Sequence, residues 1–374
     1  MIVYTATCLF GLEGLLGREI DDLGYKRTET IDGRVTFEGD ESACARANIN
    51  LRFAERVYIS LGSFSVLSFD NLFEGTKALE WERYISSSDA FPVSGHSIKS
   101  KLFSVPDCQR IIKKAIASRL GSKYGIKILP EDSGITYKVE FFIFKDTASL
   151  MIDTSGVALH KRGYRPETVT APLRETLAAA LASFSRPREN VLFCDPFCGS
   201  GTIAIEAAMI MKNIAPGIKR HFAAEAFPAF PVSQWSDARQ EAVSIIRDTA
   251  FRAYAGDIDP ECVRITEEAC KRAGVDSIID VKCADALMLK SNGERGTIVT
   301  NPPYGERLMS VEEAKELYKK MGVIFRALEP WQIYILTSCQ DFERFYGRRA
   351  DKVRKLYNGM IPCFYYNFFK PVKR

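Results

Sequence analysis

A strand that ends in two prolines and a tyrosine gives this chain an unusual chemical surface. Asn301, Pro302, Pro303 and Tyr304 directly follow the apolar run Thr297–Thr300. Neither proline has a backbone N–H, and each holds the residue before it extended, so the Asn301 amide and nearby carbonyls can point outward as hydrogen-bond acceptors. We therefore expect a pocket for a planar base that carries an amino group, with the tyrosine ring stacked on the base. The alternative is a Pro-Pro turn with a surface tyrosine.

A second pattern, upstream, joins an apolar strand to a helix through a glycine turn. Residues 191–195 precede Gly199 and Gly201, and an apolar helix is expected from Thr202 onward. The glycines let a ligand approach the main chain, where the new helix presents its unpaired N–H groups. The turn lacks the Lys-Ser/Thr ending of a phosphate-binding loop and the third glycine of a dinucleotide loop, and Asp195 would repel a pyrophosphate. S-adenosylmethionine, which carries an ammonium and a sulfonium, fits this acid.

Two further acids follow at expected strand ends, as a cofactor with a ribose and an adenine requires. Residues 251–257 indicate a strand, and Asp259 is the expected N-cap of a helix, which leaves Asp257 for the ribose hydroxyls. Ile258 could pack on the adenine face, and Asp285, after another short strand, could accept from the adenine amine. Each acid taken alone is more often a cap or a solvated loop residue, so their order along the chain carries the argument.

These motifs, in this order, resemble motifs I to IV of class I S-adenosylmethionine-dependent methyltransferases that modify exocyclic amines. They are Asp-Pro-Phe-Cys-Gly-Ser-Gly-Thr at 195–202, Gly-Asp-Ile-Asp at 256–259, Ala-Asp-Ala at 284–286 and Asn-Pro-Pro-Tyr-Gly-Glu-Arg-Leu at 301–308. With residues 159–165 (Leu-His-Lys-Arg-Gly-Tyr-Arg) and 171–175 (Ala-Pro-Leu-Arg-Glu), nearly the whole chain resembles the THUMP-domain ribosomal RNA methyltransferases. This group includes bacterial large-subunit rRNA guanine-N2 methyltransferases and relatives often labelled adenine-specific DNA methylases.

The resemblance implies roles for individual residues. Asn301, Pro302, Pro303 and Tyr304 would be the catalytic residues. The cofactor would be S-adenosylmethionine, contacted by Asp195, Phe197, Gly199, Gly201, Thr202, Asp257, Ile258, Asp285, Ala286 and Pro172. One departure is the long separation of Gly201 from Asp257, which marks residues 214–250 as an insertion that lines the RNA side of the site or covers a sheet edge.

The expected architecture is α/β, with an α+β THUMP-containing RNA-binding module before a Rossmann-like class I methyltransferase domain whose doubly wound sheet is mainly parallel. We expect a ferredoxin-like α/β region at 1–65, a THUMP domain at 66–155, a linker at 156–169 and the methyltransferase domain at 170–374. Thr170 is expected to cap a helix with Pro172 in its first turn, and 360–369 to form the last, buried strands.

Basic residues gather in the amino-terminal half. Ile112, Ile116 and Leu120 recur at helical spacing within 107–120 and predict a buried face, which leaves cations on another side. Two strands, 137–144 and 148–152, are expected to turn at 145–146. The candidate RNA-binding residues are Lys99, Lys101, Arg110, Lys113 and Lys114. A solvated helix face is the commoner explanation of such a stripe, and the family resemblance favours RNA.

Composition sets the remaining limits. The chain has 374 residues, 46% of them hydrophobic, and a net charge of +4, which is too small by itself to indicate nucleic-acid binding. No apolar run approaches the roughly 20 residues of a membrane span, and no secretory leader is evident, so we expect a cytoplasmic protein. The ten cysteines and three histidines are not spaced as a metal site, and none is expected.

The sequence thus predicts methyl transfer to an exocyclic base amine of RNA, with guanine N2 of 23S rRNA, free or in an assembling large subunit, as the leading substrate. Adenine N6 of RNA or DNA is the first alternative, because Asn-Pro-Pro-Tyr serves adenine amines at least as often. A non-catalytic RNA-binding ribosome-assembly factor is the second. Asp195, Gly199, Gly201, Asp257 and Asn301 are all present, which argues against loss of activity.

Overall fold

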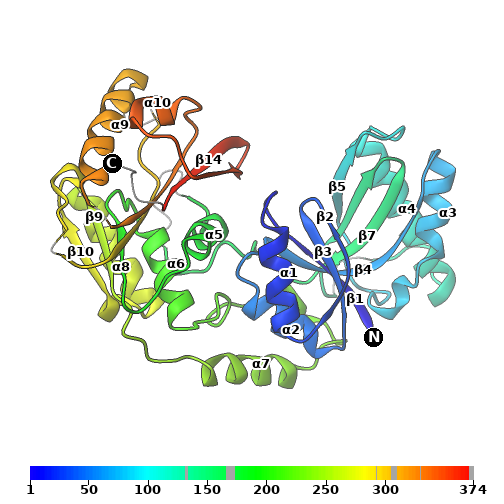
Figure 1. The fold of residues 1–374 in the computed structure, drawn as a ribbon. Coiled ribbons are helices and arrows are strands. Elements are labelled where there is room, and N and C mark those ends of the chain that lie inside the picture. Colours follow the sequence, from blue (N-terminus) through cyan, green and yellow to red (C-terminus); the bar gives the residue numbers. More distant parts are fainter. Residues whose placement is uncertain (131–133, 166–172, 292, 305–309, 329, 370–374) are drawn as a thin grey trace. The chain divides into compact units, whose positions relative to one another are not determined.

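The computed structural model describes residues 1–130, 134–165, 173–291, 293–304, 310–328 and 330–369 (Figure 1). Contacts divide the chain into two compact units. The first contains Met1–Cys8, Gly17–Leu159 and His221–Gln240, and the second contains Leu9–Leu16, His160–Arg220 and Glu241–Arg374. The chain therefore crosses between the units several times.

The first unit is built on a single seven-stranded sheet of order β2-β3-β1-β4-β7-β6-β5. All neighbouring strands are antiparallel except β5 and β6. Its elements are β1 (Ile2–Thr7), α1 (Glu13–Asp22), β2 (Lys26–Ile31), β3 (Arg34–Gly39), α2 (Ser42–Asn50), β4 (Arg56–Ser65), α3 (Phe69–Ala78), β5 (Val93–Ile98), α4 (Val105–Tyr124), β6 (Val139–Phe144) and β7 (Thr147–Asp153). Strand β4 pairs with β1 on one side and with β7 on the other, so one strand joins both halves of this sheet.

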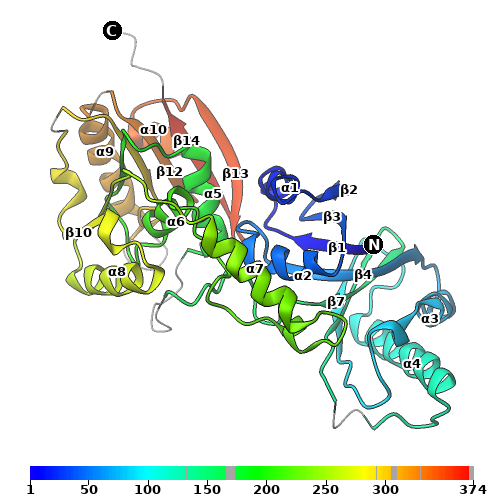
Figure 2. The same cartoon turned by 90° about the horizontal axis from the view of Figure 1, so that it is seen from below.

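The predicted basic helix is confirmed and is longer than expected. Helix α4 buries Ile112, Ile116 and Leu120 completely, and it packs beside α3 (Figure 2). The predicted hairpin is also confirmed: Phe144 pairs with Thr147 across a two-residue turn. Lys145 and Asp146 both have left-handed angles, with φ of 49° and 60°, as the tight turn of a twisted hairpin requires.

The inserted segment packs within the first unit. Ala224 N–H donates to the Thr154 carbonyl at 3.0 Å, and the Phe227 ring stacks on Tyr137 with centroids 4.2 Å apart. Trp235, almost fully buried, stacks on Phe222. Buried aromatic contacts hold the part of the insertion between 221 and 240, because these rings need apolar partners and find them beside the end of β7.

The second unit contains a seven-stranded sheet of order β10-β9-β8-β11-β12-β14-β13. Its elements are α5 (Glu175–Ser185), β8 (Leu192–Asp195), α6 (Thr202–Met211), β9 (Ala253–Asp257), α8 (Pro260–Ala273), β10 (Ile279–Cys283), β11 (Gly296–Thr300), α9 (Val311–Arg326), β12 (Gln332–Thr337), α10 (Phe342–Tyr346), β13 (Lys352–Asn358) and β14 (Ile361–Phe368), with α7 (Val232–Ser244) running from the first unit into it. Strands β10, β9, β8, β11 and β12 are parallel, and β14 runs antiparallel to both of its neighbours.

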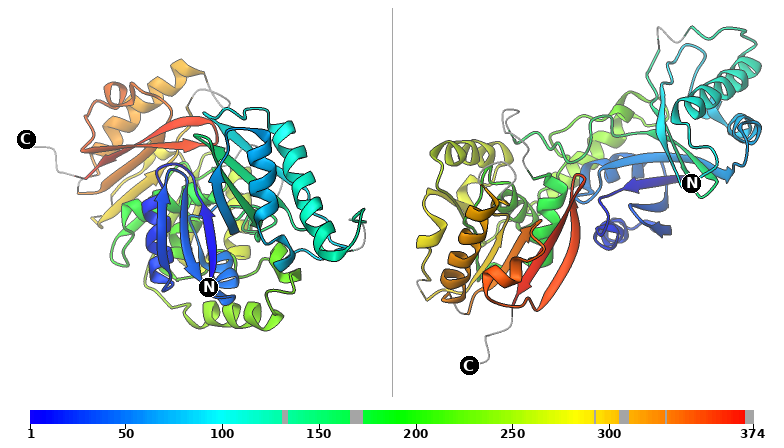
Figure 3. Two further views of the ribbon diagram at one scale, coloured as in Figure 1. Left: turned by 90° about the vertical axis from the view of Figure 1, so that its right-hand side faces the viewer. Right: turned by 90° about the horizontal axis from the view of Figure 1, so that it is seen from above.

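Helices cover both faces of this sheet, as a doubly wound architecture requires. Helix α6 contacts both α5 and α8 on one face, and α9 contacts α10 on the other. Along β14, Tyr365 donates to the Leu181 carbonyl of α5 at 2.9 Å, whereas the ring of Tyr366 packs on Phe342 of α10. The β13–β14 hairpin forms one edge of the sheet (Figure 3). The predicted mainly parallel, doubly wound fold is confirmed.

Two expected elements differ in their ends. The expected helix at 170–184 begins only at Glu175, with Arg174 as N-cap, and Leu173, although buried, precedes it. Thr170 and Pro172 lie outside the described residues. The last strand is buried from Tyr365 to Phe368, but Met360 is 94% exposed because it occupies the turn before β14.

In the part of the chain that the structure describes, no helix is long and apolar enough to cross a membrane. All ten cysteines lie in the described part of the chain, and none of them forms a disulfide bond.

Candidate active site

The carboxyl end of β11 carries the proline-containing tetrapeptide. Pro302 is buried, and Asn301, Pro303 and Tyr304 are partly buried. The Tyr304 hydroxyl donates to the Asn301 side-chain oxygen. Since a carboxamide oxygen has two lone pairs, this bond leaves one for a further donor. Burial raises the pKa of Tyr304, so its hydroxyl stays protonated and acts as a donor.

Helix α9 holds the tetrapeptide from behind. The Tyr318 hydroxyl lies 2.8 Å from the Pro303 carbonyl oxygen, to which it donates, and 3.0 Å from the hydroxyl of Thr337 at the end of β12. No hydrogen bond links the Pro302 carbonyl to another residue that the structure describes. The backbone acceptors therefore differ: Tyr318 binds the Pro303 carbonyl, and no described residue donates to the Pro302 carbonyl.

Asp195, at the end of β8, is the most unusual carboxylate of the second unit. Its side chain is 1% exposed, and Oδ1 accepts a 2.7 Å hydrogen bond from the Thr300 hydroxyl. Oδ2 is buried and has no described partner. Burial raises the pKa of Asp195 to about 7, and the Thr300 hydroxyl opposes that shift. A buried carboxylate oxygen without a donor favours a cationic ligand.

The glycine turn has the geometry predicted for it. Gly199 and Gly201 have φ of 53° and 73°, angles that side chains disfavour. A Cβ at Gly201 would stand 2.5 Å from Thr266 of α8, whereas one at Gly199 would meet nothing within 4 Å. Gly201 is therefore required by packing, and Gly199 lies beside open space that a ligand can occupy.

Asp257, at the end of β9, does more than the sequence indicated. Its two carboxylate oxygens accept from the N–H groups of Gly199 at 2.9 Å and of Asp259 at 3.0 Å. Asp257 is therefore not free, contrary to the expectation from the sequence. It ties the glycine turn to the loop after β9. Each oxygen keeps a second lone pair. The prediction of Asp259 as N-cap is confirmed, since its side chain accepts from Glu261 N–H.

The expected adenine side is exposed. Ile258 is 71% exposed, and Met288, one helical turn after Asp285, is 74% exposed. Asp285 caps the short 3-10 helix Ala286–Met288 by accepting from Leu287 N–H at 2.8 Å. Two large apolar side chains left in water next to strand-end acids form a surface that a flat ring can cover.

Arg162, Tyr164 and Arg165 of the motif 159–165 belong to a largely buried ionic cluster. Arg162 and the Tyr164 hydroxyl both contact Glu206 Oε1 of α6, at 3.1 and 2.9 Å. Arg165 donates to Thr202 Oγ1 at 2.8 Å, at the first residue of α6. The cluster therefore fixes the helix that follows the glycine turn, and Thr202 acts in it as a scaffold residue.

The acceptor groups and the open space at this site fit S-adenosylmethionine. An unpartnered buried carboxylate oxygen at Asp195 suits an ammonium, the Asp257 lone pairs suit ribose hydroxyls, and the space beside Gly199 suits a ligand close to the main chain. Phe197 is partly buried against the core that includes Ile298. Among the described residues, no group of three or more His, Cys, Asp or Glu is arranged to hold a metal ion.

Sequence reasoning missed the side chains that hold the site. These are Thr300, Tyr318 and Arg165. Thr300 had a detectable signal, a hydroxyl at the end of an otherwise apolar strand, whereas Tyr318 lies in an ordinary amphipathic helix. Pro172 and residues 305–308 lie outside the described residues.

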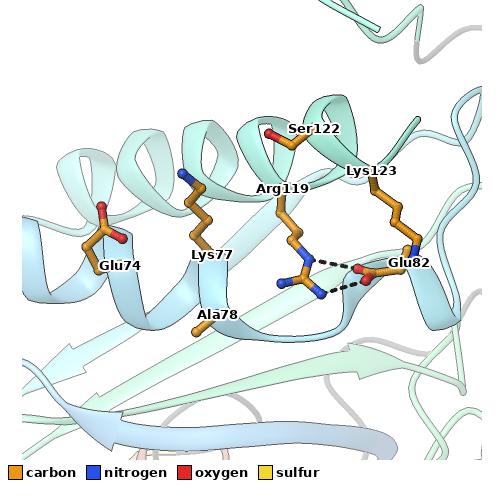
Figure 4. Close-up of a pocket in the computed structure, with 7 residues that line it drawn as sticks. All are labelled: Glu74, Lys77, Ala78, Glu82, Arg119, Ser122 and Lys123. Atoms are coloured by element: carbon orange, nitrogen blue, oxygen red, sulfur yellow. Dashed lines mark hydrogen bonds and ion pairs between the residues drawn. The ribbon is translucent and has the colours of Figure 1, made fainter. Parts of the chain in front are cut away.

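In the first unit, the expected RNA-binding residues are all exposed but not equivalent. Arg110 forms an ion pair with Asp107, which reduces its net charge, and Lys113 lies 5.7 Å above the Phe91 ring. Lys99, Lys101 and Lys114 are exposed. An open hollow of about 490 Å³ between α3 and α4 carries other charged groups, and Arg119 donates to both oxygens of Glu82 there (Figure 4).

Comparison with family models divides the chain into three matched regions. Residues 4–58 match a model described as "RlmL ferredoxin-like domain", residues 67–153 match "THUMP domain", and residues 162–367 match "RMKL-like, methyltransferase domain".

Two curated proteins are similar along the whole chain. "Putative RNA methyltransferase YpsC" of Bacillus subtilis (strain 168) is 45% identical over 370 residues, which cover 98% of this chain and 96% of that protein. "Ribosomal RNA large subunit methyltransferase K/L" of Psychromonas ingrahamii is 31% identical over 391 residues. The chain spans about half of the latter protein, since the match covers 51% of its length.

Solved structures agree. A possible methylase from Clostridium difficile 630 is 44% identical, with a TM-score of 0.95 over 100% of this chain and 99% of that one. "SMU.472, a putative methyltransferase complexed with SAH" is 38% identical, with a TM-score of 0.91 over 100% and 99% of the two chains. TrmN from Thermus thermophilus, 21% identical with a TM-score of 0.67, shares the fold.

Proposed function

Because this chain belongs to the RMKL-like family of S-adenosylmethionine-dependent RNA methyltransferases, we propose that it methylates the exocyclic N2 of a guanine in 23S ribosomal RNA. One observation carries the proposal. Buried Asp195 Oδ2 and the partly buried Asn301 side-chain oxygen both have capacity left for a ligand. They are joined through Thr300, which bonds to Asp195 and precedes Asn301. A cation site and an amine-acceptor site thus stand on neighbouring strands.

The acceptors at the tetrapeptide address the chemical difficulty of the reaction. The lone pair of a purine amine is delocalised into the ring, which makes the nitrogen a poor nucleophile. Asn301 Oδ1 and the Pro302 carbonyl, by accepting the two amine hydrogens, favour a pyramidal nitrogen with its lone pair directed out of the ring plane. Tyr318 keeps the Pro303 carbonyl in place. The tetrapeptide therefore supplies positioning and hydrogen bonding.

Tyr304 has two roles in this proposal. Its ring holds the base by stacking, and its hydroxyl fixes the Asn301 carboxamide with the oxygen available for the amine. The nitrogen carries a positive charge only after it has gained a methyl group, and the resulting ammonium loses a proton readily to water. No side chain has to remove a proton beforehand.

The acids at the ends of β8 and β9 would hold the cofactor. Asp195 would bind its ammonium, Asp257 its ribose hydroxyls, and Ile258 and Asp285 its adenine, with Ala286 beside them. Bound there, S-adenosylmethionine supplies an electrophilic methyl group on a sulfonium. The tie between Asp257 and Gly199 N–H keeps the glycine turn in register with the ribose acid.

RNA as substrate is supported by the amino-terminal half. Residues 67–153 match the THUMP model, and exposed cations lie on the loop after β5 and on α4. The choice of large-subunit RNA rests on the K/L relative, which this chain matches over half of that protein's length. The cytoplasm is the location that this substrate requires.

Adenine N6 is the second candidate. It is favoured by the Asn-Pro-Pro-Tyr sequence and by the name of one structural relative, "predicted N6-adenine-specific DNA methylase" of Listeria monocytogenes, 44% identical with a TM-score of 0.93. The preference for guanine rests on the extension at 305–308, which lies outside the described residues, and on the K/L relative.

One experiment separates these candidates. The protein is incubated with methyl-labelled S-adenosylmethionine and with 23S rRNA, large subunits or genomic DNA from a strain that lacks the gene. The nucleic acid is then digested to nucleosides. We expect label in N2-methylguanosine from the ribosomal samples, and none with the Asn301→Ala variant. Label in N6-methyladenosine would establish the second candidate, and no label in any sample despite cofactor binding would point to a non-catalytic assembly factor.

A further inference from the structure

The loop after β5 presents one aromatic ring to water. Phe103 is 80% exposed, the highest value for an aromatic side chain among the described residues, and Ile98 at the end of β5 is 47% exposed. A phenylalanine of this kind forgoes most of the roughly 1.5–3 kcal/mol that burial contributes. Exposed apolar residues scattered singly are normal on proteins, so exposure alone decides nothing.

The residues around Phe103 hold it in a defined place. Leu102 is buried, and its carbonyl accepts from the Ser97 hydroxyl at 2.5 Å and from the Cys108 thiol of α4 at 3.9 Å. Phe103 N–H donates to the Lys101 carbonyl at 3.2 Å. The next residue, Ser104, is the N-cap of α4. The ring therefore projects from a backbone anchored on both sides.

Exposed lysines lie on the loop of this ring and on the turn that is bonded to the loop. Lys99 and Lys101 are exposed in the same loop. The loop is bonded to the β6–β7 turn, because Lys101 N–H donates to Asp146 Oδ1 at 2.7 Å, and that turn presents the exposed Lys145. Two acids of this region already have partners. Asp146 Oδ1 accepts from Lys101 N–H, and Asp107 forms an ion pair with Arg110. The ring thus shares its loop with two exposed lysines, and a third exposed lysine lies on the turn bonded to that loop.

An exposed ring among lysines fits a nucleic acid strand whose bases are unpaired. In a duplex the base faces are covered by their neighbours, so only phosphates could reach this surface. An unpaired base can lie on the Phe103 face while its phosphates contact the lysines. A protein partner would have to present a complementary acidic and apolar patch, for which the structure offers no observation.

We propose that Phe103 is a stacking platform for an unpaired base of the RNA substrate, flanked by phosphate contacts from Lys99, Lys101 and Lys145. This inference rests on the proposed function only in taking RNA as the substrate. The first unit then binds a single-stranded stretch of the substrate RNA, and does not select a regular duplex.

The test measures binding of the full-length protein to two fluorescein-labelled RNAs, a single strand of about 12 nucleotides and a duplex of equal length. Phe103→Ala is expected to weaken single-strand binding about 5- to 100-fold and to leave duplex binding unchanged. Phe103→Trp should bind the single strand as tightly as the wild type does. Ile128→Ala is the matched control, since Ile128 is 83% exposed in the same unit and has no assigned role.

Three outcomes would overturn the proposal. These are wild-type binding by Phe103→Ala, equal losses for the single strand and the duplex, and a loss with intact ribosomal subunits but not with naked RNA, which would indicate a protein partner. Because the readout is binding, it is independent of methyl transfer. A wild-type protein that binds through Phe103 and methylates no RNA would contradict the proposed function and leave this inference standing.

Discussion

In the methyltransferase unit, the groups expected to touch ligand are tied to named partners, whereas in the amino-terminal unit the expected contacts stand in solvent. Asp195 accepts from Thr300 at the end of β11, Asp257 accepts from Gly199 of the glycine turn, and Asn301 is held by Tyr304. Lys99, Lys101 and Lys114 are exposed.

The two sheets explain this difference. Parallel strands end at one common edge, so residues distant in sequence converge there and support one another. The antiparallel sheet of the first unit has no such common edge, and its candidate contacts lie on a helix face and on a loop. Substitutions should therefore have large, specific effects in the methyltransferase unit and small, additive effects in the amino-terminal unit.

The largest effect is expected at Asn301. Replacing it with alanine removes an acceptor that acts on the reacting amine, and we expect turnover to fall about 10²- to 10³-fold with little change in cofactor affinity. Single-turnover transfer of labelled methyl groups, with calorimetry for cofactor binding, measures both. Asn358→Ala, at a partly buried asparagine at the end of β13, is the control. Wild-type turnover by Asn301→Ala would show that the acceptor role is wrong.

Asp257→Ala should weaken cofactor binding about 10- to 100-fold, because it removes both the ribose acceptor and the partner of Gly199 N–H. Turnover at saturating cofactor should change much less. Asp276→Ala, at an exposed aspartate of the same unit, is the control. If cofactor affinity stays the same in the Asp257 variant, the ribose assignment fails, and the remaining strand-end acids become the candidates.

The buried carboxylate of Asp195 predicts a pH dependence. With its pKa raised to about 7, cofactor affinity should rise about tenfold per pH unit up to pH 7 and then level off, because the ammonium binds the ionised form. The folded carboxyl holds its proton where the unfolded one has lost it. The cofactor-free protein should therefore lose stability as pH rises from about 4 to 7, with no further loss from this group above 7.

The charged and polar groups that face Asp195 affect this pH dependence through its pKa. Asp257 disfavours ionisation, and Thr300 and the Phe197 N–H favour it, while the neighbouring Cys198 thiol and Tyr365 hydroxyl stay neutral because burial raises their pKa values. Thr300→Val should shift the midpoint to higher pH and weaken binding about 10-fold at pH 7. Thr300→Ser should behave like the wild type. An unshifted midpoint in the valine variant would separate Thr300 from the cofactor site.

The smallest effect is expected from the cations of α4. Replacing Lys113 and Lys114 with alanine should weaken RNA binding several-fold and lower the slope of log affinity against log salt by about 2. The matched control replaces Lys319 and Lys320, two consecutive exposed lysines of α9. An unaltered slope would mean that this helix face is only solvated. A loss as large as that expected for the Asp257 variant would contradict the contrast between the two units.

Much of the site was predictable because its signals are local. Proline at 302 and 303, glycine at 199 and 201, and acids after apolar runs impose backbone geometry or strand ends within a few residues. Asp259 as N-cap and the 145–146 hairpin turn follow from the same kind of rule, and both are confirmed. The role of Arg162 was not predictable, since nothing local in the stretch 159–165 shows that this side chain will meet Glu206 inside the fold.

By itself, the sequence determined the order of strands and helices, the doubly wound class and the residues placed at strand ends. Only the tertiary structure decided their partners: that Thr300 bonds to Asp195, that Tyr318 holds the Pro303 carbonyl, and that the insertion packs through Phe227 onto Tyr137. Backbone preferences act over a few neighbouring residues, whereas a buried hydrogen bond joins residues far apart in the chain and exists only once packing has brought them together.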